Sequence, residues 1–122
     1  MNVKEDVKEF VKKSGAIDVL HALSEGEKSF GELKRGLNPA TLSNRLKEGI
    51  SLGLIEQIVR REEKSLRPVV AYKLTKKGFE VFEKIKPVIS EYSKIKAEIE
   101  QLENEIKKKK ERLKKLLDEL DF

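Results

Sequence analysis

The chain has 122 residues, which allows one small domain and an extension but no large enzyme cleft. It contains no cysteine and one histidine, so disulfides, thiolate metal sites, cysteine nucleophiles and an imidazole cluster within one chain are excluded. Charged residues make up 40% of the chain and the net charge is +5, which weakly favours a polyanionic partner. We predict no metal, no cofactor and no enzymatic activity, because the sequence offers neither a nucleophile with a base nor a phosphate-binding glycine loop.

The sequence also lacks signals for export or for a membrane. The stretch MNVKEDVKEFVKK has no apolar centre of a signal peptide, and no apolar run approaches the roughly 18 residues that a membrane span needs. We therefore expect a cytoplasmic protein with no membrane partner. Many Lys and Glu with few Asn, Gln and Met are typical of thermophile proteins.

Apolar spacing predicts three helices before residue 38. The first covers residues 2–13 and stops at Ser-Gly, and its apolar face consists of Val3, Val7, Phe10 and Val11. The second covers residues 16–24, and residues 24–29 form a loop. Ser29 caps a short third helix, whose predicted buried positions are Phe30, Leu33 and Leu37.

The fourth helix has the clearest boundaries. Asn38 is a favourable N-cap, Pro39 suits the first helical position, and Gly53 is placed to end the helix. The predicted buried stripe is Leu42, Leu46 and Ile50. At 100° per residue, other side chains point away from this stripe or lie on its shoulders: Ala40, Asn44, Lys47 and Ser51 point away, and Thr41, Ser43 and Arg45 lie on the shoulders.

Two strands follow, at residues 54–60 and 69–74, and form a hairpin. Val70, Tyr72 and Leu74 are expected on one face of the second strand. The polar tip carries Arg61, Lys64 and Arg67, and Pro68 lies where no ladder hydrogen bond is required. Thr75 then caps a further helix.

From Pro87 onward nothing interrupts the helical pattern up to the C-terminus. Steps of 3 and 4 residues pick out one stripe: Tyr92, Ile95, Ile99, Leu102, Ile106, Lys109, Leu113, Leu116 and Leu120. A stripe that keeps a 3.5-residue period over about four heptads indicates a coiled-coil seam. We expect domains at residues 1–86 and 87–122, the second for dimerisation; alternatively, this helix joins a three- or four-helix bundle with residues 3–11.

Charge along this helix favours antiparallel pairing of two copies. Residues 88–105 carry five Glu and two Lys, a balance of −3, whereas residues 106–122 carry seven basic and four acidic residues, a balance of +3. An antiparallel pair sets Ile99 against Leu116 and Leu102 against Leu113. A parallel pair would place Lys109 against Lys109 within the seam. We therefore expect an antiparallel homodimer.

The phrases FGELKRGL, TLSNRLKE, LGLIE and YKLTKKG, between residues 30 and 78, carry a family resemblance. Together they resemble winged helix-turn-helix transcription regulators of the HxlR and ArsR type, most closely HxlR, over about residues 16–86. The fold implied is mainly α with a small β-hairpin wing, to which the sequence adds the long C-terminal coiled-coil helix. Gly49 departs from the family, which more often has leucine there, and metal sensing by thiolates cannot be carried over from ArsR-like proteins.

By this resemblance, residues 39–52 are the recognition helix in the major groove of double-stranded DNA, and residues 61–68 are the wing on the adjacent groove or backbone. The helix N-terminus adds free N–H groups for a phosphate. The DNA-binding residues expected are Ser29, Ala40, Thr41, Ser43, Asn44, Arg45, Lys47, Arg61, Lys64 and Arg67.

Three functions remain open at this stage. The leading hypothesis is a sequence-specific transcription regulator that acts as a homodimer. An architectural or chromatin protein with little sequence preference is the second, and a winged-helix protein-interaction module is the third.

Overall fold

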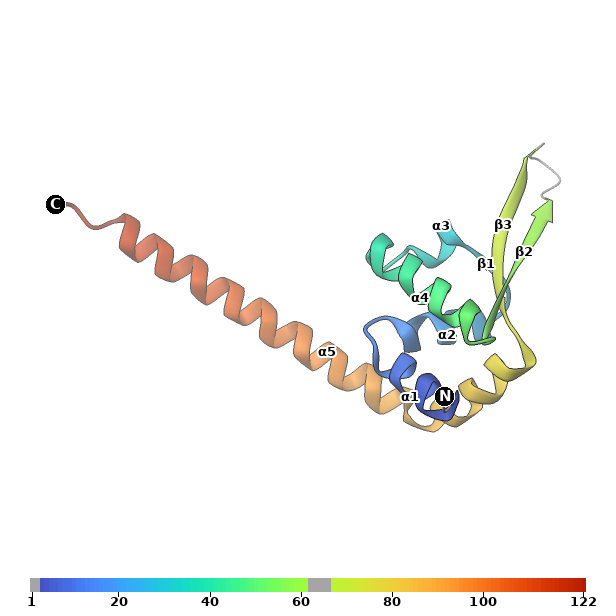
Figure 1. The fold of residues 1–122 in the computed structure, drawn as a ribbon. Helices are drawn as coiled ribbons and strands as arrows, with labels where there is room; N and C mark the ends of the chain where they lie inside the picture. Colours follow the sequence, from blue (N-terminus) through green and yellow to red (C-terminus); the bar gives the residue numbers. More distant parts are fainter. Residues whose placement is uncertain (1–2, 62–66) are drawn as a thin grey trace. The chain divides into compact units, whose positions relative to one another are not determined.

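The computed structural model describes residues 3–61 and 67–122, which divide into two compact units, Met1–Ile85 and Lys86–Phe122 (Figure 1). The fold is mainly helical, with a small antiparallel sheet and a long C-terminal helix, which confirms the predicted class. In chain order the elements are α1 (Val3–Lys12), α2 (Ala16–Ser24), β1 (Lys28–Ser29), α3 (Phe30–Leu33), α4 (Pro39–Ser51), β2 (Ile55–Arg61), β3 (Pro68–Leu74) and α5 (Lys76–Asp118).

The sheet has three strands in the order β1-β3-β2. The predicted hairpin of β2 and β3 is present, and β1 is an additional strand that was not predicted. β2 pairs with β3 from Ile55 opposite Leu74 to Arg61 opposite Pro68. On the other edge of β3, Lys28 pairs with Tyr72. The prediction of a loop at residues 24–29 was wrong at its last two residues, because a two-residue strand is too short to show an alternating pattern.

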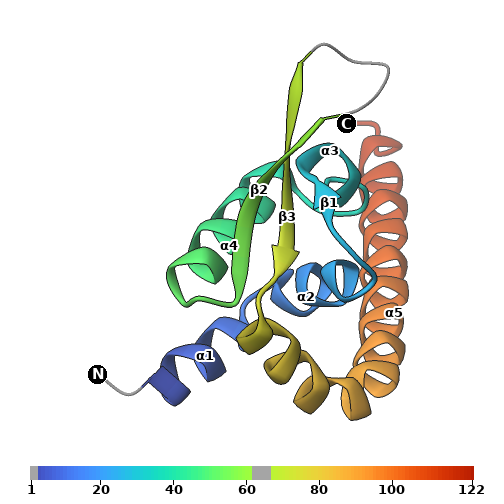
Figure 2. The same ribbon diagram turned by 90° about the vertical axis from the view of Figure 1, so that its right-hand side faces the viewer.

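The core of the first unit lies between α2, α4 and the sheet (Figure 2), since α2 packs against β3 and α4 packs against α2 and β2. Its most deeply buried residues are Phe10, Ala16, Val19, Leu20, Leu23, Leu42, Leu46, Leu54, Ile55 and Ala71. The short α3 buries Leu33, but Phe30 is half-buried rather than buried as expected. Leu37, also expected to be buried in this helix, lies after its end and is half-buried. On β3, Leu74 and Ala71 are buried, whereas Val70, which was expected on the same face as Leu74, is 40% exposed.

The buried stripe of α4 differs from the prediction at its C-terminal end. Leu42 and Leu46 are buried, whereas Ile50 is 38% exposed and Gly49 is buried instead. Each step of four residues turns the helix by 40° beyond a full turn, so Ile50 lies about 80° away from Leu42 while Gly49 lies about 20° away on the other side. The space at Gly49 is filled by Ile55, whose Cδ1 would lie 2.5 Å from a Cβ at residue 49.

The turn between α4 and β2 is fastened to the start of α5 by backbone carbonyls. Leu52 O accepts from Lys77 Nζ (2.9 Å), Gly53 O accepts from Thr75 Oγ1 (2.5 Å), and Leu54 O accepts from Thr75 N (3.0 Å). Thr75 Oγ1 also accepts from Gly78 N (3.0 Å), as its predicted capping role requires. We call these contacts the carbonyl clamp.

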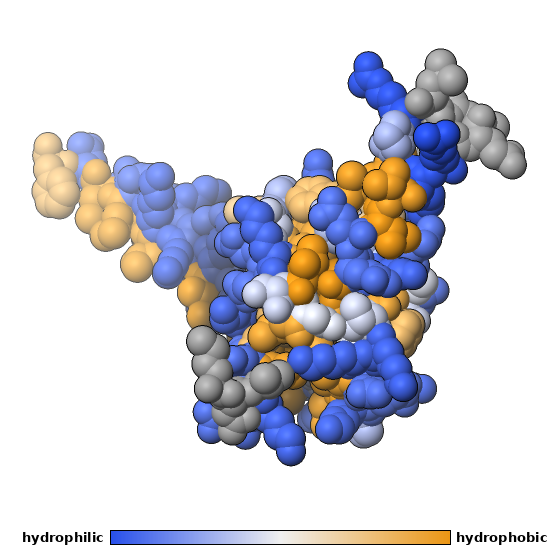
Figure 3. Space-filling model, turned by 45° about the vertical axis from the view of Figure 1, so that its right-hand side comes forward, coloured by the Kyte–Doolittle hydropathy of each residue, from blue (hydrophilic) through white to orange (hydrophobic). Residues whose placement is uncertain are grey.

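In the second unit, α5 continues through Pro87 and ends at Asp118. The expected helix to the C-terminus was therefore wrong for the last four residues, because the final carbonyls of a helix lack partners and chain ends fray. Figure 3 shows apolar side chains gathered along one edge of this helix and hydrophilic ones along the other. Among the described residues, no helix is long and apolar enough to cross a membrane.

Two glycine substitutions should differ in stability, because one added methyl group would clash with backbone and the other with a side chain. A Cβ at Gly78 would collide with the carbonyl of Leu54, and relief requires movement of the backbone in the carbonyl clamp. We expect Gly78→Ala to lower the free energy of unfolding by about 3 kcal/mol.

Gly49→Ala is the matched control, because its Cβ would meet the side chain of Ile55, closest at the terminal Cδ1, rather than backbone, and it gains roughly 1 kcal/mol of helix propensity. Its free energy of unfolding, measured by urea titration, should exceed that of Gly78→Ala by at least about 2 kcal/mol. Equal losses in the two variants would contradict the role assigned to the Leu54 carbonyl.

Candidate nucleic-acid interface

The start of α4 is held by its N-cap. Asn38 Oδ1 accepts from Ala40 N (2.9 Å) and Thr41 N (3.4 Å), and Asn38 O accepts from Leu42 N (2.9 Å). Pro39 has no N–H to offer. With this cap in place, the N–H groups of Ala40, Thr41 and Leu42 are engaged within the chain, and the partial positive charge of the helix end is what they leave for a phosphate.

One face of α4 carries a row of exposed side chains, which we call the reading face: Ala40, Asn44, Lys47 and Ser51. These residues fall within about 60° around the helix, opposite the buried stripe. Thr41 and Ser43 are half-buried on its two sides. The structure therefore brings together most of the predicted α4 residues on one accessible surface, and amide, hydroxyl and ammonium groups there suit contacts to base edges and phosphates.

Arg45 lies on the side of α4, away from the reading face, and its side chain is only 15% exposed. Its Nε donates to Ser14 O (2.9 Å), and Nη1 donates to Glu48 Oε1 (2.7 Å). Glu48 Oε2 also accepts from Lys13 Nζ (3.1 Å). Burial opposes ionisation of Glu48, but the hydrogen bonds from Lys13 and Arg45 outweigh it and lower the pKa of this carboxyl.

A hollow of about 410 Å³ lies beside this network, between α1 and α4. Its walls include Phe10 and Leu52 and a mixture of charges: Asp6, Glu9, Lys13, Lys47 and Glu48. Lys47 thus shares this surface with acidic side chains of α1.

Of the predicted wing at residues 61–68, the structure describes residues 61, 67 and 68. Arg61 ends β2 and Arg67 precedes β3, and both side chains are exposed. Lys64 lies outside the residues that the structure describes. The two arginines are therefore placed at the base of the hairpin tip, as the sequence predicted.

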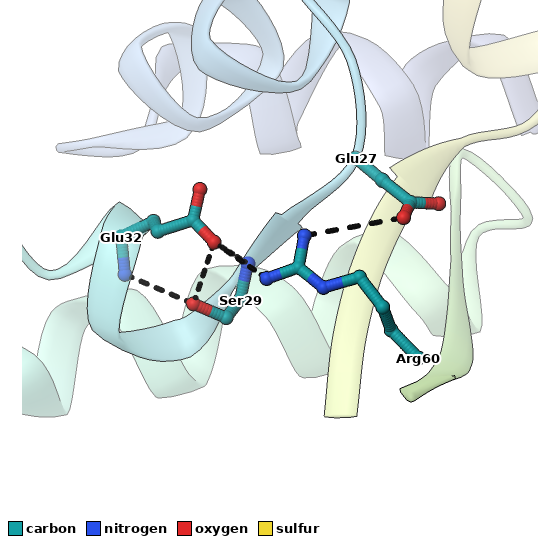
Figure 4. A network of polar contacts seen from close by, with 4 residues as sticks. All are labelled: Glu27, Ser29, Glu32 and Arg60. Carbon is teal, nitrogen blue, oxygen red and sulfur yellow. Dashed lines mark hydrogen bonds and ion pairs between the residues drawn. The ribbon is translucent and has the colours of Figure 1, made fainter. Parts of the chain in front are cut away.

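Ser29 is engaged in a capping box rather than turned to solvent as a free hydroxyl (Figure 4). Its Oγ accepts from Glu32 N (3.2 Å) and donates to Glu32 Oε1 (3.1 Å). Arg60 on β2 completes the network, since Nη2 donates to Glu32 Oε1 (2.8 Å) and Nη1 lies 3.9 Å from Glu27 Oε1. The hydrogen bond from Arg60, followed by those from Ser29, lowers the pKa of Glu32. This network links β2 to α3.

Sequence reasoning did not single out two exposed basic residues in the turn that leads to α4. Lys34 and Arg35 are exposed in the turn that joins α3 to α4. The sequence contained this information, because the phrase FGELKRGL places Lys34 and Arg35 between the two helices of the helix-turn-helix. Sequence reasoning also missed the partner of Ser29, although Ser followed three residues later by Glu is the spacing of a capping box.

The family model that describes an HxlR-like helix-turn-helix matches residues 11–104. The chain belongs to the HxlR-like helix-turn-helix family. This family consists of non-enzymatic, DNA-binding transcription regulators, so DNA binding and transcription regulation are the general function of the chain. The predicted resemblance is confirmed. No curated protein matches the chain.

Solved structures share the fold of this chain. A possible HxlR family transcriptional factor from Thermoplasma volcanium is similar at a TM-score of 0.62 and 24% identity, covering 80% of this chain and 87% of that one. The protein ytfH from Salmonella typhimurium is similar at a TM-score of 0.62 and 21% identity, covering 84% of this chain and 90% of that one. Diamide-treated YodB from B. subtilis is similar at a TM-score of 0.57 and 26% identity, covering 72% of this chain and 90% of that one.

The Arg60–Glu32 contact should make stability depend on pH. Because the folded-state pKa of Glu32 is lowered, its carboxylate stabilises the fold above its ordinary pKa of about 4.3, and this stabilisation is lost as pH falls through the lowered value. Glu32→Gln keeps the capping geometry and removes the charge. At pH 7 we expect it to cost at most about 1 kcal/mol, since the contact is at the surface.

At pH 3 the free energies of unfolding of the wild type and Glu32→Gln should be nearly equal, as measured by urea titration. Glu80→Gln, a change of the same kind at an exposed position of α5, is the control and should show no such convergence. A constant difference between the wild type and Glu32→Gln from pH 7 to pH 3 would contradict the assignment.

Proposed function

We propose that the protein is a sequence-specific transcription regulator that binds DNA as a homodimer, with α4 in the major groove and the wing on the adjacent groove or backbone. Family membership supports DNA binding and regulation in general. The observation that carries the specific proposal is the reading face, which sets small polar side chains and one lysine on a capped helix. A rigid helix fits the major groove and can place such groups against base edges.

The proposed roles follow from the chemistry of each side chain. Asn44 pairs bidentately with adenine, and Lys47 contacts guanine or a phosphate. Thr41 and Ser43 serve bases or phosphates on either side, and Ala40 lets the helix approach the groove closely. Exposed cations around α4 hold the sugar-phosphate backbone: Lys34, Arg35, Arg61 and Arg67. Ser29 and Arg45, whose polar groups are engaged within the chain, are not assigned a direct contact.

The homodimer is supported by the apolar stripe on α5. Its Ile and Leu side chains are strongly exposed in the single chain: Ile95 46%, Ile99 49%, Leu102 57%, Ile106 53%, Leu113 58% and Leu116 63%. Burial of a Leu or Ile side chain stabilises by roughly 1.5 to 3 kcal/mol, so a second copy along this stripe gains substantial free energy. Leu120 belongs to the predicted seam but lies beyond the end of α5.

The charge pattern supports antiparallel pairing, as argued above from residues 88–105 and 106–122. In the proposed register Leu102 of one protomer faces Leu113 of the other. Tyr92 begins the seam and Lys109 stands opposite Ile106, where its long side chain can reach water at the edge of the helix pair. The acidic half of each helix then lies along the basic half of its partner.

Equilibrium binding tests the specific function. The duplex upstream of the protein's own gene should be bound at least about a thousandfold more tightly than a scrambled duplex at the same salt concentration. Asn44→Ala should weaken binding of the upstream duplex by about 1 to 3 kcal/mol and leave binding of the scrambled duplex nearly unchanged. Lys47→Glu should weaken binding of both duplexes.

Lys84→Glu is the control for the charge reversal, because it makes the same change at an exposed position of α5 outside the proposed interface. Near-equal affinity of the wild type for both duplexes, with a steep salt dependence, would favour an architectural protein. Absence of binding to either duplex would favour the protein-interaction module.

Cysteine cross-linking tests the dimer and its direction, because the chain has no native cysteine. In the antiparallel register, Leu102→Cys/Leu113→Cys should form a covalent dimer under mild oxidation, read on a non-reducing gel. Each single variant should remain uncross-linked at low concentration. Efficient cross-linking of both single variants would indicate a parallel pair, and absence of any dimer in the double variant would contradict the proposal.

A further inference from the structure

We infer that Arg45 is a positioning residue for DNA recognition: it fixes the rotation of α4 by tying its side to the turn between α1 and α2, and it does not contact DNA itself. This inference rests on the proposed function, because it concerns how the reading face is presented.

The contacts of Arg45 leave its guanidinium engaged at two points. Nε donates to Ser14 O at 2.9 Å, and Nη1 donates to Glu48 Oε1 at 2.7 Å, with the side chain 15% exposed. Charge-assisted hydrogen bonds of this length are among the stronger ones in proteins. Swinging the guanidinium away from α4 toward a phosphate would break both bonds, leaving the Ser14 carbonyl without this donor and Glu48 with Lys13 alone.

The same turn touches α4 at a second point. Gly15 has φ +83°, a conformation that L side chains rarely adopt, and it is buried against the helix. A Cβ there would lie 3.3 Å from Leu37 Cδ2 and 3.4 Å from Thr41 Cγ2. Thr41 and Arg45 are one helical turn apart and only about 40° apart around α4, so the turn holds one side of the helix along its length.

The Lys13–Glu48 ion pair adds a third link, between the residue that follows α1 and the C-terminal half of α4. The two groups lie 3.1 Å apart, with side-chain exposures of 48% and 32%. The links involve consecutive residues, 13 to 15, on one side, and positions 41, 45 and 48 on the other. All three α4 positions lie on the same side of the helix, within about 60° of one another.

The geometry of the helix makes this attachment important for recognition. Side-chain tips lie about 6 Å from a helix axis, so a rotation of about 10° displaces them by roughly 1 Å. A bidentate pair between Asn44 and adenine depends on hydrogen-bond distances and angles that such a displacement degrades. Contacts to phosphates by long, flexible lysines tolerate it better. Loss of the attachment should therefore reduce specific binding more than non-specific binding.

The experiment compares Arg45→Met and Arg45→Lys with the wild type, using the full chain and both duplexes across a salt series. Met keeps an unbranched side chain without donors, and Lys keeps the charge but cannot donate in two directions from a planar group. We expect both variants to lose about tenfold in affinity for the upstream duplex. Affinity for the scrambled duplex should stay within about twofold, and the slope of log K against log salt should be unchanged, because no phosphate contact is lost.

Lys47→Met is the matched control, since it removes a cation from the reading face itself. Its salt slope should fall by about 1. A similar fall for Arg45→Met, with Arg45→Lys close to wild type, would mean that Arg45 contacts phosphate and would overturn the inference.

Two other results of this binding experiment would each have a different meaning. Equal losses on both duplexes, accompanied by a reduced fraction of folded protein in thermal unfolding, would mean a role in stability alone and would also overturn it. A wild type without specificity, whose binding Asn44→Ala leaves unchanged, would instead overturn the proposed function and the inference together.

Discussion

The carbonyl clamp is the constraint on which the DNA-binding unit depends. Three successive carbonyls, of residues 52 to 54, accept hydrogen bonds from Lys77 and Thr75 at the start of α5. Those carbonyls follow the last residue of α4 and precede β2, so one set of contacts fixes the end of α4, the base of the wing and the start of α5. Gly78 is required there because its lack of a side chain lets the Leu54 carbonyl approach the helix.

The other parts of α4 are fixed by different means. Asn38 holds its first turn, and Arg45 and Gly15 hold its side against the turn between α1 and α2. The wing is held separately, since Arg60 on β2 binds the carboxylate that also closes the capping box of α3. The described part of the wing and α4 are thus attached to the same small core by independent polar contacts, which keep the side chains of both in a defined geometry.

The sequence predicted those features that depend on local chemistry. The Asn38–Pro39 start of α4 and the capping roles of Ser29 and Thr75 depend on residues within one helical turn, and the structure confirms them. Features that depend on distant residues were missed or wrong. The burial of Gly49 in place of Ile50 depends on Ile55 filling the space, and the pairing of Lys28 depends on Tyr72.

Arg45 shows the same limit at the candidate site. Its position on the shoulder of α4 was predicted correctly, but a shoulder residue can face either DNA or the protein. The choice was decided by Ser14, which lies 31 residues away in the sequence and could not be anticipated from helical periodicity. The same holds for Arg60, whose partner Glu32 is 28 residues away.

The pairing of Arg45 and Arg60 with carboxylates affects which cations remain to account for the net charge of +5. The +5 surplus falls on residues 1–87, because the tail sums to zero. Within that region, Arg45 and Arg60 are paired with Glu48 and Glu32, so these two cations and two anions offset each other within the protein. Five exposed cations lie on α4, in the turn before it and at the base of the wing: Lys34, Arg35, Lys47, Arg61 and Arg67. If each neutralises one phosphate, the salt slope is roughly −4.5 per protomer, so a weakly basic chain is compatible with strong electrostatic attraction to DNA.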